Sequence, residues 1–103
     1  MNVEELDQYV KSECKAYDIF IEKARENQNE KNSRRPSTKR FNPEKVEREA
    51  QKMWVSVVTN LHEKLKSDKS LKKAAPLRWK SFMMENNILE IFEDSMGELE
   101  LNE

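Results

Sequence analysis

The residue types that most often carry out catalysis are scarce in this 103-residue chain. Cys14 is the only cysteine and His62 the only histidine, so a thiol–imidazole pair would require folding to unite two distant positions. A single glycine excludes a glycine-rich phosphate loop, and no cysteine–histidine cluster has metal-ligand spacing. Cys14 falls on an apolar helical stripe, where an inert thiol is expected. The sequence therefore predicts no enzymatic activity, metal, cofactor or small-molecule substrate.

Positive charge gathers around a tryptophan in the stretch SLKKAAPLRWK (Ser70–Lys80). Neighbours on a helix point about 100° apart, so we expect Trp79 to face the core while the basic side chains stay in solvent. Such a cluster at the start of a helix suits a polyanion or an acidic protein surface. The plain alternative is the solvated face of a core helix. The candidate contact residues are Lys69, Lys72, Lys73, Arg78 and Lys80.

A second basic stretch, KNSRRPSTKR (Lys31–Arg40), lacks apolar periodicity, which predicts a loop. It suits a nuclear-localisation or nucleic-acid patch, with a simple solvated loop as the alternative. Ser37 follows Arg-Arg-Pro and is a candidate phosphorylation site for a kinase that prefers basic residues, where phosphate would cancel much of the local charge. The candidate basic residues of the loop are Arg34, Arg35, Lys39 and Arg40.

The net charge of −1 hides a strong segregation along the chain. Residues 1–30 carry 8 acidic and 4 basic residues, and residues 31–80 carry 5 and 15, a local charge of +10. Residues 81–103 carry 7 acidic residues and no basic one. Such segregation points to interactions with charged partners more than the total charge does.

The first two predicted elements are helices separated by a loop. Apolar residues recur every three or four positions over 3–27, which predicts one helix there. Residues 28–41 are polar and contain a proline, so we expect a mobile loop that is dispensable for folding. Asn42 and Pro43, a preferred N-cap and a preferred first residue, predict that the next helix spans 43–66.

The C-terminal part begins at Pro76, which can open a helix but not occupy its middle. A polar residue, Asn86, interrupts the apolar stripe, so residues 77–96 form either one bent helix or two shorter ones. Phe82, with the adjacent Met83 and Met84, suits the core or a partner-binding groove. We expect Gly97 to cap the last helix.

Together these patterns predict an all-α fold, a small three- to four-helix bundle. The bundle forms a single domain over residues 1–97, followed by a frayed acidic tail over 98–103. Trp54 and Trp79 lie on the helical stripes and should anchor the core. The lone cysteine, the lack of an apolar run long enough to span a membrane and the lack of a signal peptide favour an intracellular protein, cytoplasmic or nuclear.

Three segments resemble the MADF domain, a Myb/SANT-like DNA-binding family, over about residues 3–86. They are LDQYVKSECKAYD (Leu6–Asp18), EAQKMWVSVVTNL (Glu49–Leu61) and LRWKSFMMEN (Leu77–Asn86). The resemblance implies three helices around a tryptophan-rich core, with the third helix lying in the DNA major groove.

Two functions remain open from the sequence. The first is a non-enzymatic helical module, a protein–protein adaptor or regulator within a larger, for example nuclear and transcription-related, complex, which binds a protein partner or a second copy of itself. The alternative, which the resemblance favours, is a double-stranded DNA-binding module of a transcription regulator that uses the basic 69–80 region. The acidic C-terminal segment would repel DNA and tilts the interpretation toward the adaptor.

Overall fold

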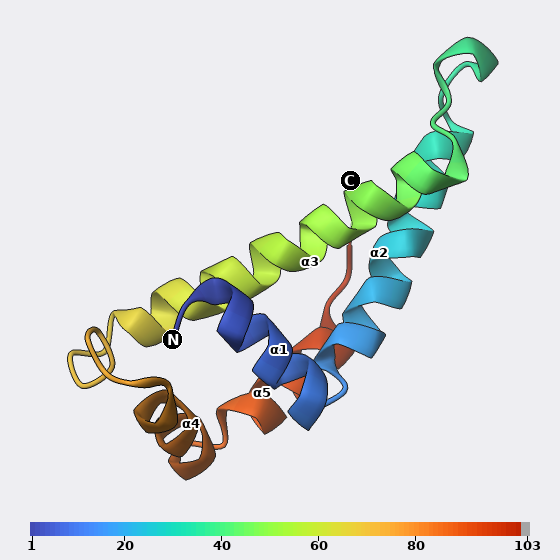
Figure 1. Ribbon diagram of the computed structural model, residues 1–103. Coiled ribbons are helices and arrows are strands. Elements are labelled where there is room, and N and C mark those ends of the chain that lie inside the picture. Colours follow the sequence, from blue (N-terminus) through green and yellow to red (C-terminus); the bar gives the residue numbers. More distant parts are fainter. Residues whose placement is uncertain (102–103) are drawn as a thin grey trace.

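Helices make up all the regular structure in the computed structural model, which describes residues 1–101 (Figure 1). No strand occurs in this range, which confirms the all-α class. A short 3-10 helix, η1 (Ser37–Lys39), lies between the second and third α-helices. The α-helices are α1 (Val3–Glu13), α2 (Ala16–Ser33), α3 (Pro43–Lys66), α4 (Pro76–Glu85) and α5 (Ile88–Glu98).

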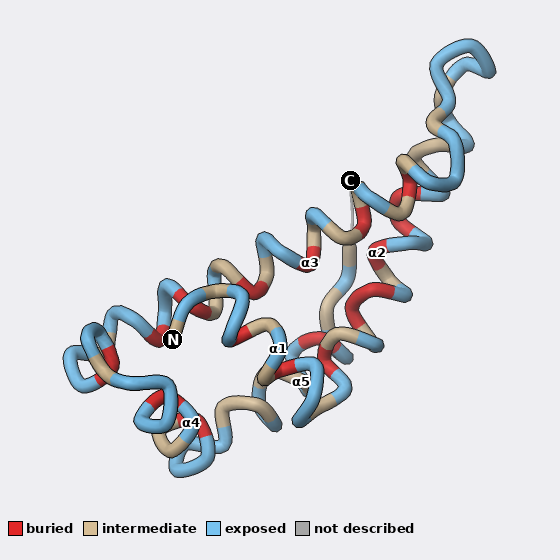
Figure 2. Tube along the Cα trace, in the orientation of Figure 1, coloured by how far each residue is buried: buried red, intermediate tan, exposed pale blue. Residues whose placement is uncertain are grey.

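The molecule has a packed body and a projecting arm. The body is built where α1 and α2 pack on α3 and where α5 packs on α2 and α4. The arm is the far end of the α2–α3 hairpin, and its tip, residues 34–42, extends away from every other element (Figure 1). The molecule is consequently elongated, with principal extents of 51 × 23 × 21 Å. Figure 2 shows buried positions along the facing sides of α2 and α3 and none at the tip.

Helix α3 begins and ends where the sequence predicted. The Asn42 side chain accepts a hydrogen bond from the Lys45 backbone N–H at 2.8 Å, and Pro43 is the first helical residue. Both features satisfy or remove N–H groups that have no partner within the helix. The predicted span 43–66 is therefore confirmed.

Trp54 on α3 is the centre of the core. Its side chain is 1% exposed, and its ring contacts Tyr17 and Phe20 of α2 and Phe92 of α5 at centroid distances of 5.2, 5.8 and 6.1 Å. The indole Nε1–H donates to Asp7 Oδ1 on α1 at 2.7 Å, which satisfies its only polar group. One side chain thus joins four helices.

The predicted single helix over 3–27 is wrong, because the chain breaks after α1. Cys14 is extended, with φ −151° and ψ 177°, and the backbone N–H of Lys15 donates to Glu93 Oε1 of α5 at 2.6 Å. The apolar period continues across the break because α1 and α2 bury residues of the same kind, notably Val10 and Ala16. A periodic pattern alone does not reveal such a change of direction, since α1 and α2 pack on the same core.

The predicted loop over 28–41 is too long, because α2 continues to Ser33. Gln28 is buried and lies 3.2 Å from the Met53 sulfur, so this polar residue faces the opposite helix. Asn32 then closes the tip: its Oδ1 accepts from the Phe41 N–H at 2.8 Å, and its Nδ2 donates to the Phe41 carbonyl at 2.9 Å. The connection is therefore confined to residues 34–42.

The C-terminal part of the chain forms two helices and not one bent helix. Asn86 ends α4, and Asn87 adopts φ 51°, the left-handed conformation that asparagine tolerates better than most residues. The turn redirects the chain so that α4 and α5 pack against each other.

Gly97 was predicted to cap the last helix from the position after it. It lies inside α5 instead, because this helix continues to Glu98. A lysine caps this end instead: Lys23 Nζ donates to the carbonyls of Met96, Gly97 and Leu99, each at 2.8 Å. Leu99 and Leu101 pack partly on the core, and the Leu101 carbonyl accepts from Asn27 Nδ2 of α2 at 3.1 Å, so the chain from 99 to 101 lies along α2. The predicted acidic tail over 98–103 is thus docked as far as 101; residues 102–103 lie outside the described part.

Candidate interaction surfaces

Cys14 and His62 lie at opposite ends of α1. His62 Nε2 is 2.8 Å from the carbonyl oxygen of Met1, just before α1, whereas Cys14 follows its last residue. Eleven helical residues, roughly 16 Å at 1.5 Å per residue, separate these ends. Partial burial raises the pKa of the Cys14 thiol, which opposes formation of a reactive thiolate. The two side chains therefore do not form a nucleophile–base pair.

The five predicted basic contact residues flank two buried residues in the sequence, Leu71 and Trp79. Trp79 is 2% exposed and stacks on His62 with ring centroids 5.1 Å apart, as expected from its position on the apolar stripe. Leu71, also buried, fixes the α3–α4 connection, residues 67–75. The basic side chains around these two anchors are all exposed: Lys69, Lys72, Lys73, Arg78 and Lys80.

These cations differ in their contacts. Arg78 Nη1 lies 3.7 Å from Glu85 Oε2 in an ion pair, and the Lys80 ammonium lies 5.4 Å from the Tyr9 ring centroid. The remaining three cations, on the connection itself, make no hydrogen bond or ion pair within residues 1–101: Lys69, Lys72 and Lys73. We call the five residues Lys69, Lys72, Lys73, Arg78 and Lys80 the basic cluster.

An apolar groove opens between α3 and α5. It exists because α3 packs mainly on α1 and α2, whereas α5 packs mainly on α2 and α4. The groove encloses about 570 Å³, and one of its walls, Ile91, is 57% exposed. Two charged residues also line the groove: Lys64 at the end of α3 and Asp68 on the α3–α4 connection. The apolar lining residues are Leu61, Leu65, Phe82, Ile88, Ile91 and Phe92.

A second groove, of about 960 Å³, lies between α1 and α4. Glu4, Glu5 and Glu13 of α1 make its wall acidic. Its opposite side carries Leu77 and Met84, which are 75% and 72% exposed. Of the three neighbouring residues considered from the sequence, Phe82 therefore lines the first groove, Met84 lines the second, and Met83 belongs to the core.

Most cations of the predicted basic loop hold the tip together. Arg34 forms an ion pair with Glu30 one turn earlier, and Arg40 donates to the carbonyls of Ser33 and Arg35 at 3.2 and 3.1 Å. The Arg35 guanidinium lies 3.9 Å from the Phe41 ring centroid. Lys45 contacts the same ring at 4.0 Å. Lys39 extends into solvent, and Ser37, the predicted phosphorylation site, is exposed on η1.

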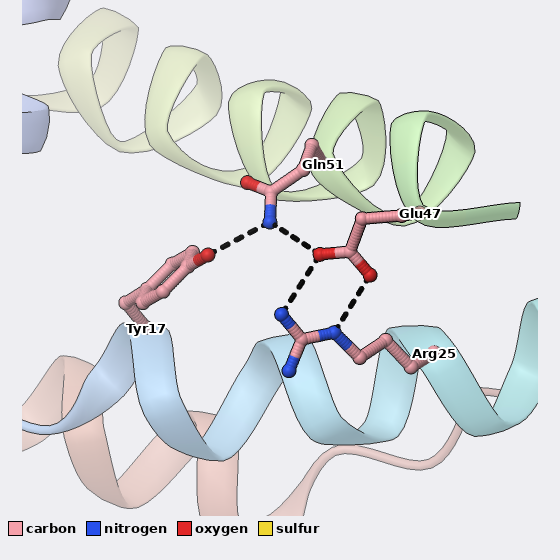
Figure 3. A network of polar contacts seen from close by, with 4 residues as sticks. All are labelled: Tyr17, Arg25, Glu47 and Gln51. Carbon is pink, nitrogen blue, oxygen red and sulfur yellow. Dashed lines mark hydrogen bonds and ion pairs between the residues drawn. The ribbon is translucent and has the colours of Figure 1, made fainter. Parts of the chain in front are cut away.

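A polar network that the sequence did not reveal joins α2 to α3 along the hairpin (Figure 3). Arg25 of α2 donates from Nε and Nη2 to the two carboxylate oxygens of Glu47 on α3, both at 2.8 Å. Gln51 Nε2 donates to Glu47 at 3.0 Å and to the Tyr17 hydroxyl at 2.8 Å. The hydrogen bonds from Arg25, and secondarily from Gln51, lower the pKa of Glu47 to about 2.

Sequence reasoning also missed the groove residues Ile88 and Ile91. A signal for them was present, because apolar residues occupy four of the five positions 88–92. A helix that buries only one face needs fewer apolar residues over five consecutive positions. That excess marks a second apolar face beside the one that packs on the core.

Comparison of the chain with family models, curated proteins and solved structures gives no significant match. The resemblance to the MADF domain consequently stays a prediction. Within residues 1–101, no helix has the length and apolar character needed to cross a bilayer, and no three potential metal ligands gather in one place.

Proposed function

We propose that this chain is a non-enzymatic interaction module whose α3–α5 groove binds an acidic amphipathic helix of a protein partner. The observation that carries the proposal is the unfilled apolar groove beside a lysine-rich connection. A helix laid in such a groove inserts apolar side chains spaced three or four residues apart.

The apolar lining supplies the attraction. Burying hydrocarbon surface stabilises a complex by roughly 25 cal/mol per Å². Ile91 gives more than half of its surface to solvent, and Phe82, Ile88 and Phe92 are only partly covered. A bound helix would cover these side chains, which the body of this chain leaves open.

The charges select the partner. Lys64 borders the groove, and Lys69, Lys72 and Lys73 on the adjoining connection lack carboxylate partners within residues 1–101. Acidic residues on the polar side of a bound helix would meet this unpaired positive charge, which speeds association and excludes basic helices.

The test uses two designed amphipathic helical peptides with identical leucine positions. One has a glutamate-rich polar face and the other a lysine-rich polar face. Fluorescence anisotropy of the labelled peptides should show at least about tenfold tighter binding of the acidic peptide, a difference of about 1.4 kcal/mol.

Two matched variants locate the binding surface. Ile91→Glu places a charge in the groove and should abolish binding, whereas Val55→Glu alters an equally exposed residue outside it and should not. Equal binding of both peptides, or equal effects of both variants, would contradict the proposal.

DNA binding by the basic cluster is the second candidate. The unpaired lysines favour it, because unpaired cations can displace the counterions of a phosphate backbone. A titration with a 20-base-pair duplex at 50 and 200 mM salt tests it: affinity should fall steeply with salt if DNA is the ligand. A mass measurement of the free chain separates both candidates from self-association.

A further inference from the structure

The sequence before Ser37 contains the recognition elements of kinases that select basic substrates. Arg34 and Arg35 stand three and two residues before the serine. Such kinases read charge patterns at these positions. Pro36 between them and the serine has φ −56° and ψ 146°, so the chain enters Ser37 in an extended conformation.

The position of Ser37 in the fold meets the requirement for access. Ser37 begins η1 within the tip, residues 34–42, and this segment extends away from the body (Figure 1). The hydroxyl makes no hydrogen bond within the described residues, and no residue from 34 to 42 is buried. The tip can therefore open into a kinase cleft without emptying the core. Such opening would break the hydrogen bonds that Asn32, Arg35 and Arg40 make at the tip.

Ser81 provides an internal comparison, because Arg78 stands three residues before it. Its surroundings are opposite, since it lies within α4 between Trp79 and Met83, which are 2% and 1% exposed. Extending this segment would unfold α4 and remove both side chains from the core. The fold thus protects one serine and presents the other.

We propose that Ser37 is a phosphorylation site for a kinase that selects basic residues. In the reaction, the Ser37 hydroxyl oxygen attacks the γ-phosphorus of ATP bound to the kinase. The new O–P bond forms as the bond to the β,γ-bridging oxygen breaks. ADP leaves, and the hydroxyl proton passes to the catalytic base of the kinase.

Phosphorylation changes the electrostatics of the tip. Residues 34–40 contain four cations and no carboxylate, a charge of +4. A phosphate contributes about −1.5 to −2 at neutral pH, so it removes nearly half of this charge. Its oxygens also offer Arg40 a stronger acceptor than the carbonyls of Ser33 and Arg35.

The experiment compares the folded chain with peptides. The full chain and two peptides, residues 31–41 and 75–85, are incubated with ATP and a purified kinase selective for basic residues, and the sites are mapped by mass spectrometry. For Ser37, the rate in the folded chain should lie within about tenfold of the peptide rate, because only the tip must open. For Ser81, the folded chain should react at least about a hundredfold more slowly than its peptide.

Substitutions identify the acceptor and its recognition. Ser37→Ala should remove the incorporated phosphate, whereas Thr38→Val should leave it. Arg34→Gln with Arg35→Gln should lower the rate in both chain and peptide. A Ser37 rate in the folded chain as strongly suppressed as that of Ser81, or phosphate mainly on Thr38, would overturn the proposal.

Discussion

The tip and the basic cluster carry positive charge at similar density but use it differently. At the tip, Arg35 and Arg40 bind an aromatic ring, an amide and backbone carbonyls of the tip itself. In the basic cluster, Lys69, Lys72 and Lys73 reach into solvent without partners among residues 1–101.

The difference follows from the chemistry of the two cations. The planar guanidinium of arginine carries several donors in fixed directions and stacks well on rings, so it can order a loop that has no core. The lysine ammonium is compact and strongly hydrated, and it gains less from such contacts. The basic cluster needs no such help, because Leu71 and Trp79 anchor its backbone. In the folded chain, Arg35 and Arg40 therefore have a structural role at the tip, whereas Lys69, Lys72 and Lys73 are available for a partner.

The largest effect should come from the core of the body, to which the tip contributes no buried residue. Trp54→Ala should lower the free energy of unfolding by about 3–5 kcal/mol, because it empties the contact point of α1, α2, α3 and α5. Denaturant titration measures the loss. Val55→Ala, at the exposed neighbouring position, is the control and should change stability by less than about 0.5 kcal/mol. A neutral Trp54→Ala would mean that the core is held elsewhere.

Asn32→Ala should open the tip and leave the basic cluster unaffected. The substitution removes both side-chain hydrogen bonds to the Phe41 backbone, each worth about 0.5–1.5 kcal/mol. Hydrogen exchange at the Phe41 amide should accelerate by about tenfold or more. Asn29→Ala, an exposed position one turn earlier, should not accelerate it. Unchanged exchange in Asn32→Ala would show that the Arg40 hydrogen bonds and the Arg35–Phe41 ring contact are enough to order the tip.

Removal of charge tests the comparison directly. Replacing Lys72, Lys73, Arg78 and Lys80 by glutamine should change the free energy of unfolding by less than about 1 kcal/mol, because these side chains are exposed. The same variant should weaken binding of the acidic peptide, and of duplex DNA if DNA is the ligand. Thermal denaturation and anisotropy measure the two effects.

A double substitution at the tip is the matched comparison for the fourfold substitution in the basic cluster. Arg35→Gln with Arg40→Gln should loosen the tip and accelerate exchange at the Phe41 amide, although only half as many charges are removed. Loss of folding in the fourfold cluster variant would reverse the assignment of structural and available charge.

The smallest expected effect is the contribution of Glu47 to stability at acidic pH. The pKa of Glu47 is lowered to about 2, so its ionised form favours the folded state. This contribution is complete above the ordinary glutamate value near 4.5 and is lost as the pH falls toward 2. Glu47→Gln should therefore reduce the loss of stability over this window, measured by denaturant titration at several pH values. Glu49→Gln, near Lys52 on the same helix, is the control. Because nearly half of each side chain, 48% of Arg25 and 42% of Glu47, is exposed, solvent screening keeps the effect small.

Much of the fold was predictable from local patterns. The all-α class, the span 43–66 and the burial of Trp54 and Trp79 all follow from periodicity and capping, and the structure confirms them. The break at Cys14 was not predictable, because the apolar period runs through it. The end of α2 was missed because Gln28 and Asn32, polar residues typical of loops, gain their partners only from α3 and the tip.

For the candidate sites, the sequence identified exposed charge but not how that charge is used. Arg35 and Lys72 are both cations in basic stretches of the sequence. Only Arg35 contacts an aromatic ring, that of Phe41, and a side-chain amide, that of Asn32. The α3–α5 groove was also out of reach, because it exists only where two helices packed on other neighbours leave a space between them.

The sequence by itself determined the helical class, the apolar positions that must be buried and the segregation of charge, because these depend on residue type and on spacing within one element. The tertiary structure alone decided where the first helix turns, which cations are engaged, and which apolar residues remain uncovered. Those properties depend on contacts between residues far apart in the chain, such as Trp54 with Asp7 and Lys23 with the end of α5. No local pattern encodes such contacts.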